Sequence, residues 1–177
     1  MVEREDILNL IKHRRSIRSF SERPVEDKDV NDILDAGRWA PSPSNVQSWI
    51  FGVVKEGDQL TILKNLSPGF PNSATLGIAV CSDRDRLSSF GGEEVEFLRA
   101  CEAAMGVQNM LLFADSLGIG TCAVASYSRK GVSELLNLPD DVTPVLLIAA
   151  GHPDDSPDPP ERTPLARITF REEYERQ

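Results

Sequence analysis

The sequence is poor in the residues that metal sites and disulfide frameworks require. It has three cysteines and two histidines among 177 residues, and no two cysteines form a C-x-x-C pair. His13 and His152 have no cysteine or carboxylate at the spacing of a metal site, so we predict no metal. We expect all three cysteines, Cys81, Cys101 and Cys122, to be reduced thiols buried in apolar surroundings.

Long apolar runs are also missing. The longest of them, such as Val145–Ala150, fall far short of the ~20 residues that span a bilayer. The N-terminal residues Met1–Asp6 are charged, with no apolar stretch behind them that would form a signal peptide. These two absences predict a cytoplasmic protein that does not bind membranes.

Positive charge is scarce, since 19 Lys and Arg stand against 28 Asp and Glu, for a formal charge of −9. Nucleic acids and anionic membranes bind basic surfaces, so this balance argues against both as partners. The exception is Lys12–Arg18, which holds four cations in seven residues. Such a small cluster predicts binding of a small anion rather than of a polymer.

The common catalytic motifs are absent as well. There is no Gly-x-Ser-x-Gly elbow and no Walker loop. Gly118-x-Gly120-x-x-Ala123 fits the dinucleotide fingerprint in its letters, but that fingerprint follows a strand and opens a helix. Here a helix precedes and a strand follows, so we interpret these glycines as the end of a helix. Serine or cysteine catalysis with a histidine base stays open, although nothing local supports it.

The apolar residues that are present, 40% of the chain, suffice for one domain spanning residues 1–177. Their spacing predicts helices over 3–13, 25–37, 58–66, 93–117 and 129–137, and strands over 49–54, 77–82, 121–126 and 142–150. This order is not a regular strand–helix alternation. It predicts an α+β fold with a mixed or antiparallel central sheet flanked by helices.

Two features of this pattern indicate a partner subunit. The middle of the long helix, Ala100–Val107, is apolar or small on almost every side, which is typical of a helix at a protein's centre or in an oligomer seam. Residues 151–177 contain five prolines by position 164, so we expect them to form an extended arm rather than core structure. We expect this arm to reach the partner.

Two segments could bind a ligand on chemical grounds. The cluster Arg14–Arg18 could hold a phosphate, because guanidinium groups and a serine hydroxyl satisfy several phosphate oxygens at once. The alternative is that its cations merely complement the dipole of the preceding helix. The segment Pro41–Gln47 could likewise be an ordinary turn whose asparagine and glutamine bond their own backbone.

Together with two later stretches, these segments resemble the nitroreductase family. RRSIRSF at 14–20 and APSPSNVQSW at 40–49 resemble the two N-terminal motifs of that family, in order and at the right separation. Residues 104–122 are similar to its central dimer helix and the strand that follows. Residues 136–165, with GHP at 151–153, are similar to its C-terminal third. The resemblance covers nearly the whole chain.

The resemblance implies a homodimer that binds flavin mononucleotide (FMN) between its subunits. Electrons would pass by a ping-pong reaction from NADH or NADPH to a small organic acceptor such as a nitroaromatic, a quinone or a flavin. The flavin performs this chemistry, so no catalytic side chain is required. By the match, the cofactor-binding residues would be Arg14, Arg15, Ser16, Arg18, Pro41, Ser42, Asn45, Gln47, Ala125, Ser126 and Arg162.

Their implied roles differ along the flavin. Arg14–Ser16 would bind the phosphate and ribityl chain, and Arg18 would lie near the pyrimidine end of the ring. The residues of 41–47 would approach from the other subunit. The backbone amides of 125–126 would lie near the flavin N5 and O4, and Arg162 would return to the phosphate.

Three departures from the family bear on the acceptor. Ala123 stands where tryptophan is frequent, Glu102 stands where aspartate is frequent, and the stretch between 82 and 93 is short for a substrate-covering lid. We expect Glu102 to be a structural carboxylate at the dimer seam. Two other interpretations stay open: a relative with reductive dehalogenase or flavin-modifying activity, and a flavin-binding carrier that never turns over.

Overall fold

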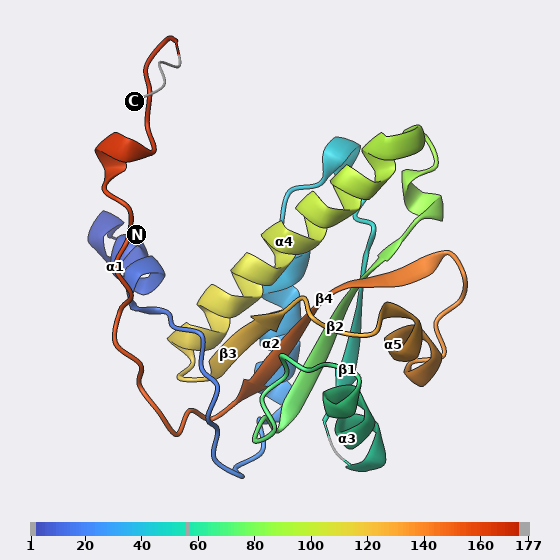
Figure 1. Cartoon of the computed structure of the whole chain (residues 1–177), viewed down its shortest axis with the longest axis horizontal. Helices are drawn as coiled ribbons and strands as arrows, with labels where there is room; N and C mark the ends of the chain where they lie inside the picture. The colour runs from blue at the N-terminus through green and yellow to red at the C-terminus, as the bar shows by residue number, and fades with distance from the viewer. Residues whose placement is uncertain (1–2, 56, 174–177) are drawn as a thin grey trace.

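The computed structural model describes residues 3–55 and 57–173 and has an α+β architecture around one four-stranded sheet (Figure 1). The helices are α1 (Arg4–His13), α2 (Asp27–Arg38), α3 (Gly57–Asn65), α4 (Gly92–Ser116) and α5 (Arg129–Leu135). The strands are β1 (Trp49–Val54), β2 (Leu76–Asp83), β3 (Gly120–Val124) and β4 (Val142–Gly151). Among the described helices, none is long and apolar enough to span a membrane.

The strand order is β1-β2-β4-β3, and all three pairings are antiparallel. Of the two predicted alternatives, the antiparallel sheet is therefore the one that forms. A parallel contact occurs outside the named strands, where Ser16 bridges to Thr121 of β3.

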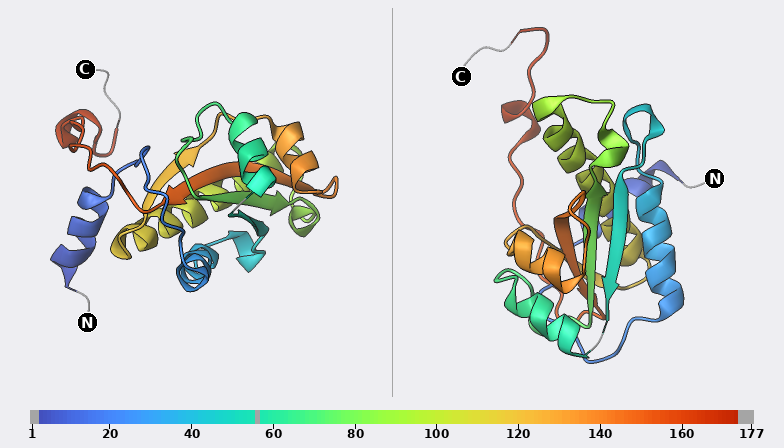
Figure 2. Two further views of the ribbon diagram at one scale, coloured as in Figure 1. Left: turned by 90° about the horizontal axis from the view of Figure 1, so that it is seen from below. Right: turned by 90° about the vertical axis from the view of Figure 1, so that its right-hand side faces the viewer.

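Side chains that alternate along the central strands separate two hydrophobic cores. Ile78 and Val80 of β2 pack with α2 and α4, whereas Ala79 and Cys81 of the same strand join the core beneath α3 and α5. Figure 2 shows these helix pairs on opposite faces of the sheet. The period of two in β2 thus gives the molecule three layers. Both faces are buried, which explains why β2 is apolar at nearly every position.

The long helix α4 packs one side against the sheet and α2. A Cβ at Gly37 of α2 would lie 2.1 Å from the terminal methyl carbon of Met110, so the absence of a side chain there lets the helices approach. The opposite side of α4 exposes large apolar side chains, with Phe97 69% and Met105 37% accessible. The helix ends before Gly118, whose φ of 72° favours glycine, and this confirms the helix-end interpretation of that motif.

The helix α1 and the arm project from the same side of the molecule in Figures 1 and 2. The α1 helix forms where the apolar spacing predicts it, but none of its residues is buried. Its apolar side chains Ile7, Leu8 and Ile11 are about half accessible. In the arm, every residue from 153 to 173 is exposed.

Three predicted boundaries are wrong by two residues. The helix predicted over 25–37 begins at Asp27, the strand predicted over 121–126 ends at Val124, and the helix predicted over 129–137 ends at Leu135. The chain leaves the sheet after Val124 because the Ser128 amide donates to the carbonyl of Leu66 and its hydroxyl caps α5. The helix stops because Asn137 adopts a left-handed conformation, with φ at 50°.

Candidate flavin-binding site

The arginine segment, Arg14–Arg18, is held along the edge of β3. After α1 ends, the Ile17 amide donates to the carbonyl of Thr121 at 2.9 Å, parallel to the strand. A Cβ at Gly120 would lie 2.9–3.0 Å from the side chain of Ile17. Glycine at position 120 is therefore what lets the arginine segment approach the strand so closely.

The cations of this segment are fixed to different degrees. Arg15 donates from Nη1 to the carbonyls of Lys12 and Arg14 at 2.5 and 2.9 Å, so it does satisfy the last turn of α1, as the helix-end alternative requires. Its Nε is nevertheless buried and has no partner among the described residues. Arg18 is exposed, with one long contact of 3.4 Å to the Ser16 carbonyl. Arg15 and Arg18 thus retain donors that an anion could use.

Ala125 and Ser126 lie directly beyond β3, on the course of the arginine segment. Because Ser16 is level with Thr121 and runs parallel to it, Arg18 reaches about the level of Ala123, two residues short of Ala125. Ala125 and Ser126 are exposed, and their amides donate no described backbone hydrogen bond outside the regular elements. Cations and available amides therefore occupy neighbouring stretches of one sheet edge.

The proline loop, Pro41–Gln47, is a rigid turn. The hydroxyl of Ser42 accepts from the Gln47 amide at 3.1 Å, and the Gln47 side chain donates to the Asn45 carbonyl at 3.1 Å. Ser44, Asn45 and Gln47 all have positive φ. Internal bonding, the basis of the ordinary-turn alternative, is thus present. It also holds the loop in one strained conformation, a feature that is frequent where a ligand binds.

The proline loop and the arginine segment lie at opposite edges of the sheet within one chain. The loop leads into β1, and the arginine segment borders β3, three strand spacings or about 14 Å away. Across β2, Trp49 is level with Thr143, whereas Thr121 is level with Ala150, about 24 Å further along β4. One chain therefore does not bring its two motif segments together.

Glu102 anchors the end of the proline loop. It is 1% accessible, and its Oε2 accepts from the Ser48 amide at 3.1 Å and the Ser48 hydroxyl at 2.5 Å. That hydroxyl also lies 2.9 Å from the hydroxyl of Ser82. The sequence showed Glu102 as a departure from the family but gave no sign of its serine partners, because they lie 54 and 20 residues away in the chain.

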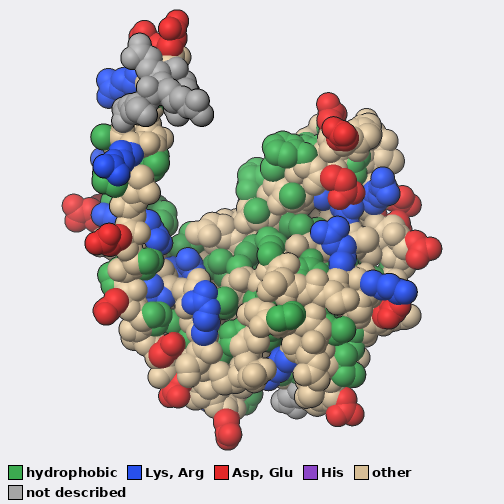
Figure 3. All heavy atoms as spheres, in the orientation of Figure 1, with side chains coloured by type: hydrophobic (Ala, Val, Ile, Leu, Met, Phe, Trp, Pro, Cys, Tyr) green, Lys and Arg blue, Asp and Glu red, His purple; other side chains and the backbone are tan. Residues whose placement is uncertain are grey.

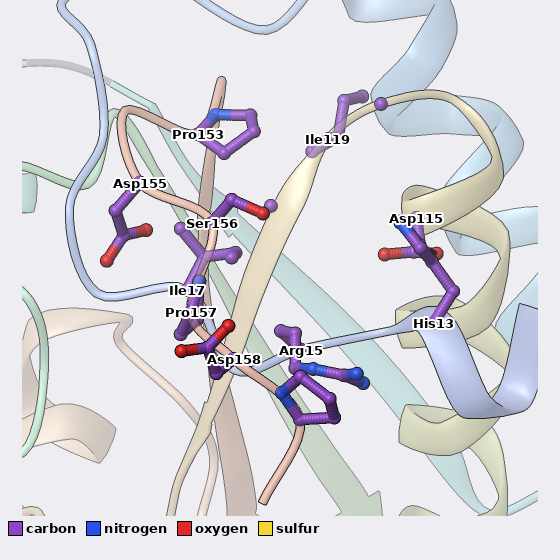
Figure 4. A pocket seen from close by; sticks show the side chains of 13 residues that line it. His13, Arg15, Ile17, Asp115, Ile119, Pro153, Asp155, Ser156, Pro157 and Asp158 are labelled. Atoms are coloured by element: carbon purple, nitrogen blue, oxygen red, sulfur yellow. Dashed lines mark hydrogen bonds and ion pairs between the residues drawn. The ribbon is translucent and has the colours of Figure 1, made fainter.

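Arg162 stands apart from the arginine segment. It is exposed on the arm and has no hydrogen bond or ion pair among the described residues. A cavity of about 390 Å³ separates the start of the arm from the body (Figure 4). His13 and Asp115 pair at 3.0 Å on one wall, and Asp155 and Asp158 of the arm lie on the opposite wall. Because three of its lining residues are carboxylates, the interior of this cavity is a poor phosphate site.

The residues along β3 fit FMN better. FMN requires cations at its phosphate and hydrogen-bond donors beside its ring. The unpartnered Nε of Arg15, the exposed Arg18 and the available amides of 125–126 offer these groups. Figure 3 shows a broad notch between the arm and the body, bordered by basic side chains and floored by neutral and hydrophobic surface. This donor set suits a ligand with an anionic end and a flat apolar end.

Comparison with known proteins identifies the family. The sequence model of the nitroreductase family matches residues 11–72 and 59–152. A protein of Archaeoglobus fulgidus, provisionally named NADH dehydrogenase/NAD(P)H nitroreductase, is 36% identical over 87% of this chain and 89% of its own. The FMN reductase (NAD(P)H) of Bacillus subtilis is 27% identical over 96% of this chain and 74% of its own. The chain belongs to the nitroreductase family.

Solved structures agree with this family and its fold. The NADPH:FMN oxidoreductase of Vibrio harveyi, solved with NAD+, superimposes with a TM-score of 0.86 at 26% identity, over 96% of this chain and 78% of that one. A nitroreductase family protein of Streptococcus pneumoniae gives a TM-score of 0.87 at 24% identity, over 93% and 99%. The predicted family and α+β fold are confirmed. The predicted short link also holds, since residues 84–91 alone join β2 to α4.

Proposed function

We propose that this protein is an FMN-dependent oxidoreductase that passes electrons from NADH or NADPH to a small organic acceptor. The observation that carries the proposal is the arginine segment, pinned along β3 and leading toward the available amides of 125–126. Relatives named as FMN reductase and NADPH-flavin oxidoreductase support it. Bound FMN would supply the electron-carrying chemistry, taking up hydride from the nicotinamide and passing electrons on in a ping-pong reaction.

The side chains of the chain then bind and orient the cofactor. Arg14–Ser16 hold the phosphate and ribityl chain with charge-assisted hydrogen bonds. Arg18 places positive charge at the pyrimidine end of the ring, which favours negative charge there. The amides of 125–126 would donate to the ring's reactive edge, and Arg162 of the arm would add a cation at the phosphate.

The same proposal includes a cytoplasmic homodimer of single-domain chains, 1–177, in which residues 151–177 embrace the partner. Two exposed apolar surfaces support the homodimer. One is the outer side of α4 with Phe97 and Met105, and the other is the apolar side of α1. The separation of the two motif segments supports it further. In a two-fold dimer, Pro41, Ser42, Asn45 and Gln47 of one subunit would complete the site of the other.

Mixed dimers test both the cofactor site and its sharing. One variant carries Arg14→Ala and Arg15→Ala, and the other carries Asn45→Trp, so each homodimer has two damaged sites. A heterodimer purified with two tags would collect both lesions in one site and none in the other. We expect about one FMN per heterodimer, with matching nicotinamide oxidation. A heterodimer that binds no more FMN than its parents would refute the shared site.

Two simpler measurements examine the rest of the proposal. Sedimentation at micromolar concentration should give about twice the 19.5 kDa chain mass. A stable FMN-loaded monomer would contradict the dimer. The flavin colour should bleach with NADH or NADPH under nitrogen and return in air, whereas a flavin carrier without turnover would keep its colour.

A further inference from the structure

A small cavity of about 110 Å³ lies beyond the end of β3 and is lined by three other elements. Its walls come from α4, the first residue of α5 and the start of β4. β3 stops opposite Leu147, so the earlier residues of β4 have no neighbour on that side among the named strands. Val145 lies in the wall and is the extra residue of a β-bulge against the step from Val80 to Cys81. Bulges are over-represented beside active sites.

The cavity contains an arginine whose side chain is not satisfied. Arg99 of α4 is 6% accessible, and its Nη1 donates to Glu96 at 2.7 Å. Its Nε is buried without a partner among the described residues. A buried guanidinium with an unpaired donor is costly, because the charge has lost water and gained one partially exposed carboxylate in return.

A second cation lines the cavity, and a half-buried tyrosine precedes it by two residues in the chain. Arg129 lines the cavity from the start of α5. The hydroxyl of Tyr127 is buried and also lacks a hydrogen-bond partner among the described residues. Burial raises the pKa of Tyr127, and the nearby guanidinium of Arg129 opposes that shift. Glu96 is the acidic residue in the wall, which leaves a net positive charge.

We propose that Arg99, Arg129 and the Tyr127 hydroxyl bind the carboxylate or phosphate group of the electron acceptor, so that the enzyme prefers anionic acceptors. Two guanidiniums and a hydroxyl match such a group in charge and donor number. A cavity of this size holds a small anionic group rather than an aromatic ring. The acceptor's ring would then extend toward 125–126, since Arg129 follows Ser126 by three residues, about 10 Å at most.

The inference rests on the proposed flavin function, and the acceptor comparison that tests it uses two nitroaromatic probes of one shape. On FMN-loaded protein, 4-nitrobenzoate should have a KM about tenfold below that of neutral 4-nitrobenzamide, with inorganic phosphate competing only against the former. Arg129→Gln should raise the KM for 4-nitrobenzoate about three- to tenfold. The kcat and the KM for 4-nitrobenzamide should stay unchanged. Lys130→Gln makes the same charge change at the next residue, which does not line the cavity, and it should have no effect.

A second variant and a binding measurement distinguish loss of anion binding from misfolding and from loss of turnover. Tyr127→Phe removes an unpaired hydroxyl, so the variant should fold normally. It should bind 4-nitrobenzoate about threefold more weakly. Calorimetric titration of 4-nitrobenzoate into the oxidised protein, without nicotinamide, should reproduce these changes in Kd. Binding would be measurable even if the protein reduced neither probe. Failure to reduce either probe would refute the oxidoreductase proposal and not the anion site.

Two results would overturn the acceptor site. One is equal KM for both probes in the unaltered protein, with Arg129→Gln and Lys130→Gln indistinguishable. The other is a raised KM for NADPH in Arg129→Gln with 4-nitrobenzoate unaffected. That result would assign these arginines to the phosphate of the electron donor.

Discussion

The strand β2 and the arm contrast in how each is stabilised. All residues from Leu76 to Ser82 of β2 are buried, whereas none from 153 to 173 is. Both regions contain large apolar side chains, since Leu165 and Ile168 of the arm are 73% and 66% accessible. Apolar content alone therefore does not create a core. β2 gains its stability from neighbours on both faces, and the arm has no comparable neighbours among the described residues 3–55 and 57–173.

The sharpest way to test this contrast is to shorten one leucine in each region. Leu147 of β4, which pairs with β2, is fully buried, so Leu147→Ala should lower the free energy of unfolding by about 2–5 kcal/mol. Leu165→Ala should change it by less than about 0.5 kcal/mol at concentrations too low for dimers. Urea unfolding followed by circular dichroism measures both. Equal losses in the two variants would mean that the arm packs on its own chain.

The arginine segment joins the exposed α1 to the buried sheet, and a second prediction concerns it. Arg14→Ala and Arg15→Ala should each weaken FMN binding about ten- to a hundredfold, or ~1.5–3 kcal/mol, by removing a charge-assisted contact to the phosphate. Titration of the apoprotein with FMN measures this affinity. Lys28→Ala is the matched control, because Lys28 is an exposed cation of α2 that pairs with Asp32 alone among the residues that the structure describes. Unchanged affinity in both arginine variants would leave the segment with its helix-end role alone.

The smallest predicted effect lies inside the sheet. Burial raises the pKa of Cys81 from 9.0 to about 12, so the folded protein keeps this thiol protonated at a pH where the unfolded chain loses the proton. This thiol should therefore leave the free energy of unfolding unchanged below pH 9 and lower it as pH rises from 9 toward 12. Between pH 8 and 10, we expect the free energy of unfolding to fall by about 1 kcal/mol more in the unaltered protein than in Cys81→Ala. Equal losses would contradict a buried thiol.

The helices and strands could be predicted well because the local pattern of apolar residues reflects which side chains are buried. The apolar runs of β2 and α4 reflect the side chains that each element contributes to the cores. Apolar residues spaced three and four positions apart predicted α1. This spacing does not show whether the same chain covers the apolar side of the helix. Strand ends were less predictable, since Val124 ends β3 through hydrogen bonds of Ser128 rather than through its own side chain.

The candidate site was predicted as motifs, but their relation in space was not. Strand order is a property of long-range pairing, so nothing in the two N-terminal motifs indicates that they border opposite edges of the sheet. The cluster of Arg99, Tyr127 and Arg129 was missed for the same reason. Its members are ordinary residues in sequence, and the tertiary fold rather than any local motif brings Arg99 and Arg129 to one cavity. The roles of the eleven candidate cofactor-binding residues stay predictions.

The strand order also constrains how the chain can be made. β1 and β2 can pair as soon as both leave the ribosome, but β2 must wait for β4, and Val80 meets Leu146 across 66 positions of sequence. Until then, one edge of the most apolar strand is open to pairing with a foreign strand. α4 is synthesised during this interval, and it can cover one face of β2 while the edge waits. The last third of the chain thus completes the sheet, and synthesis rate sets how long the nascent protein is exposed to aggregation.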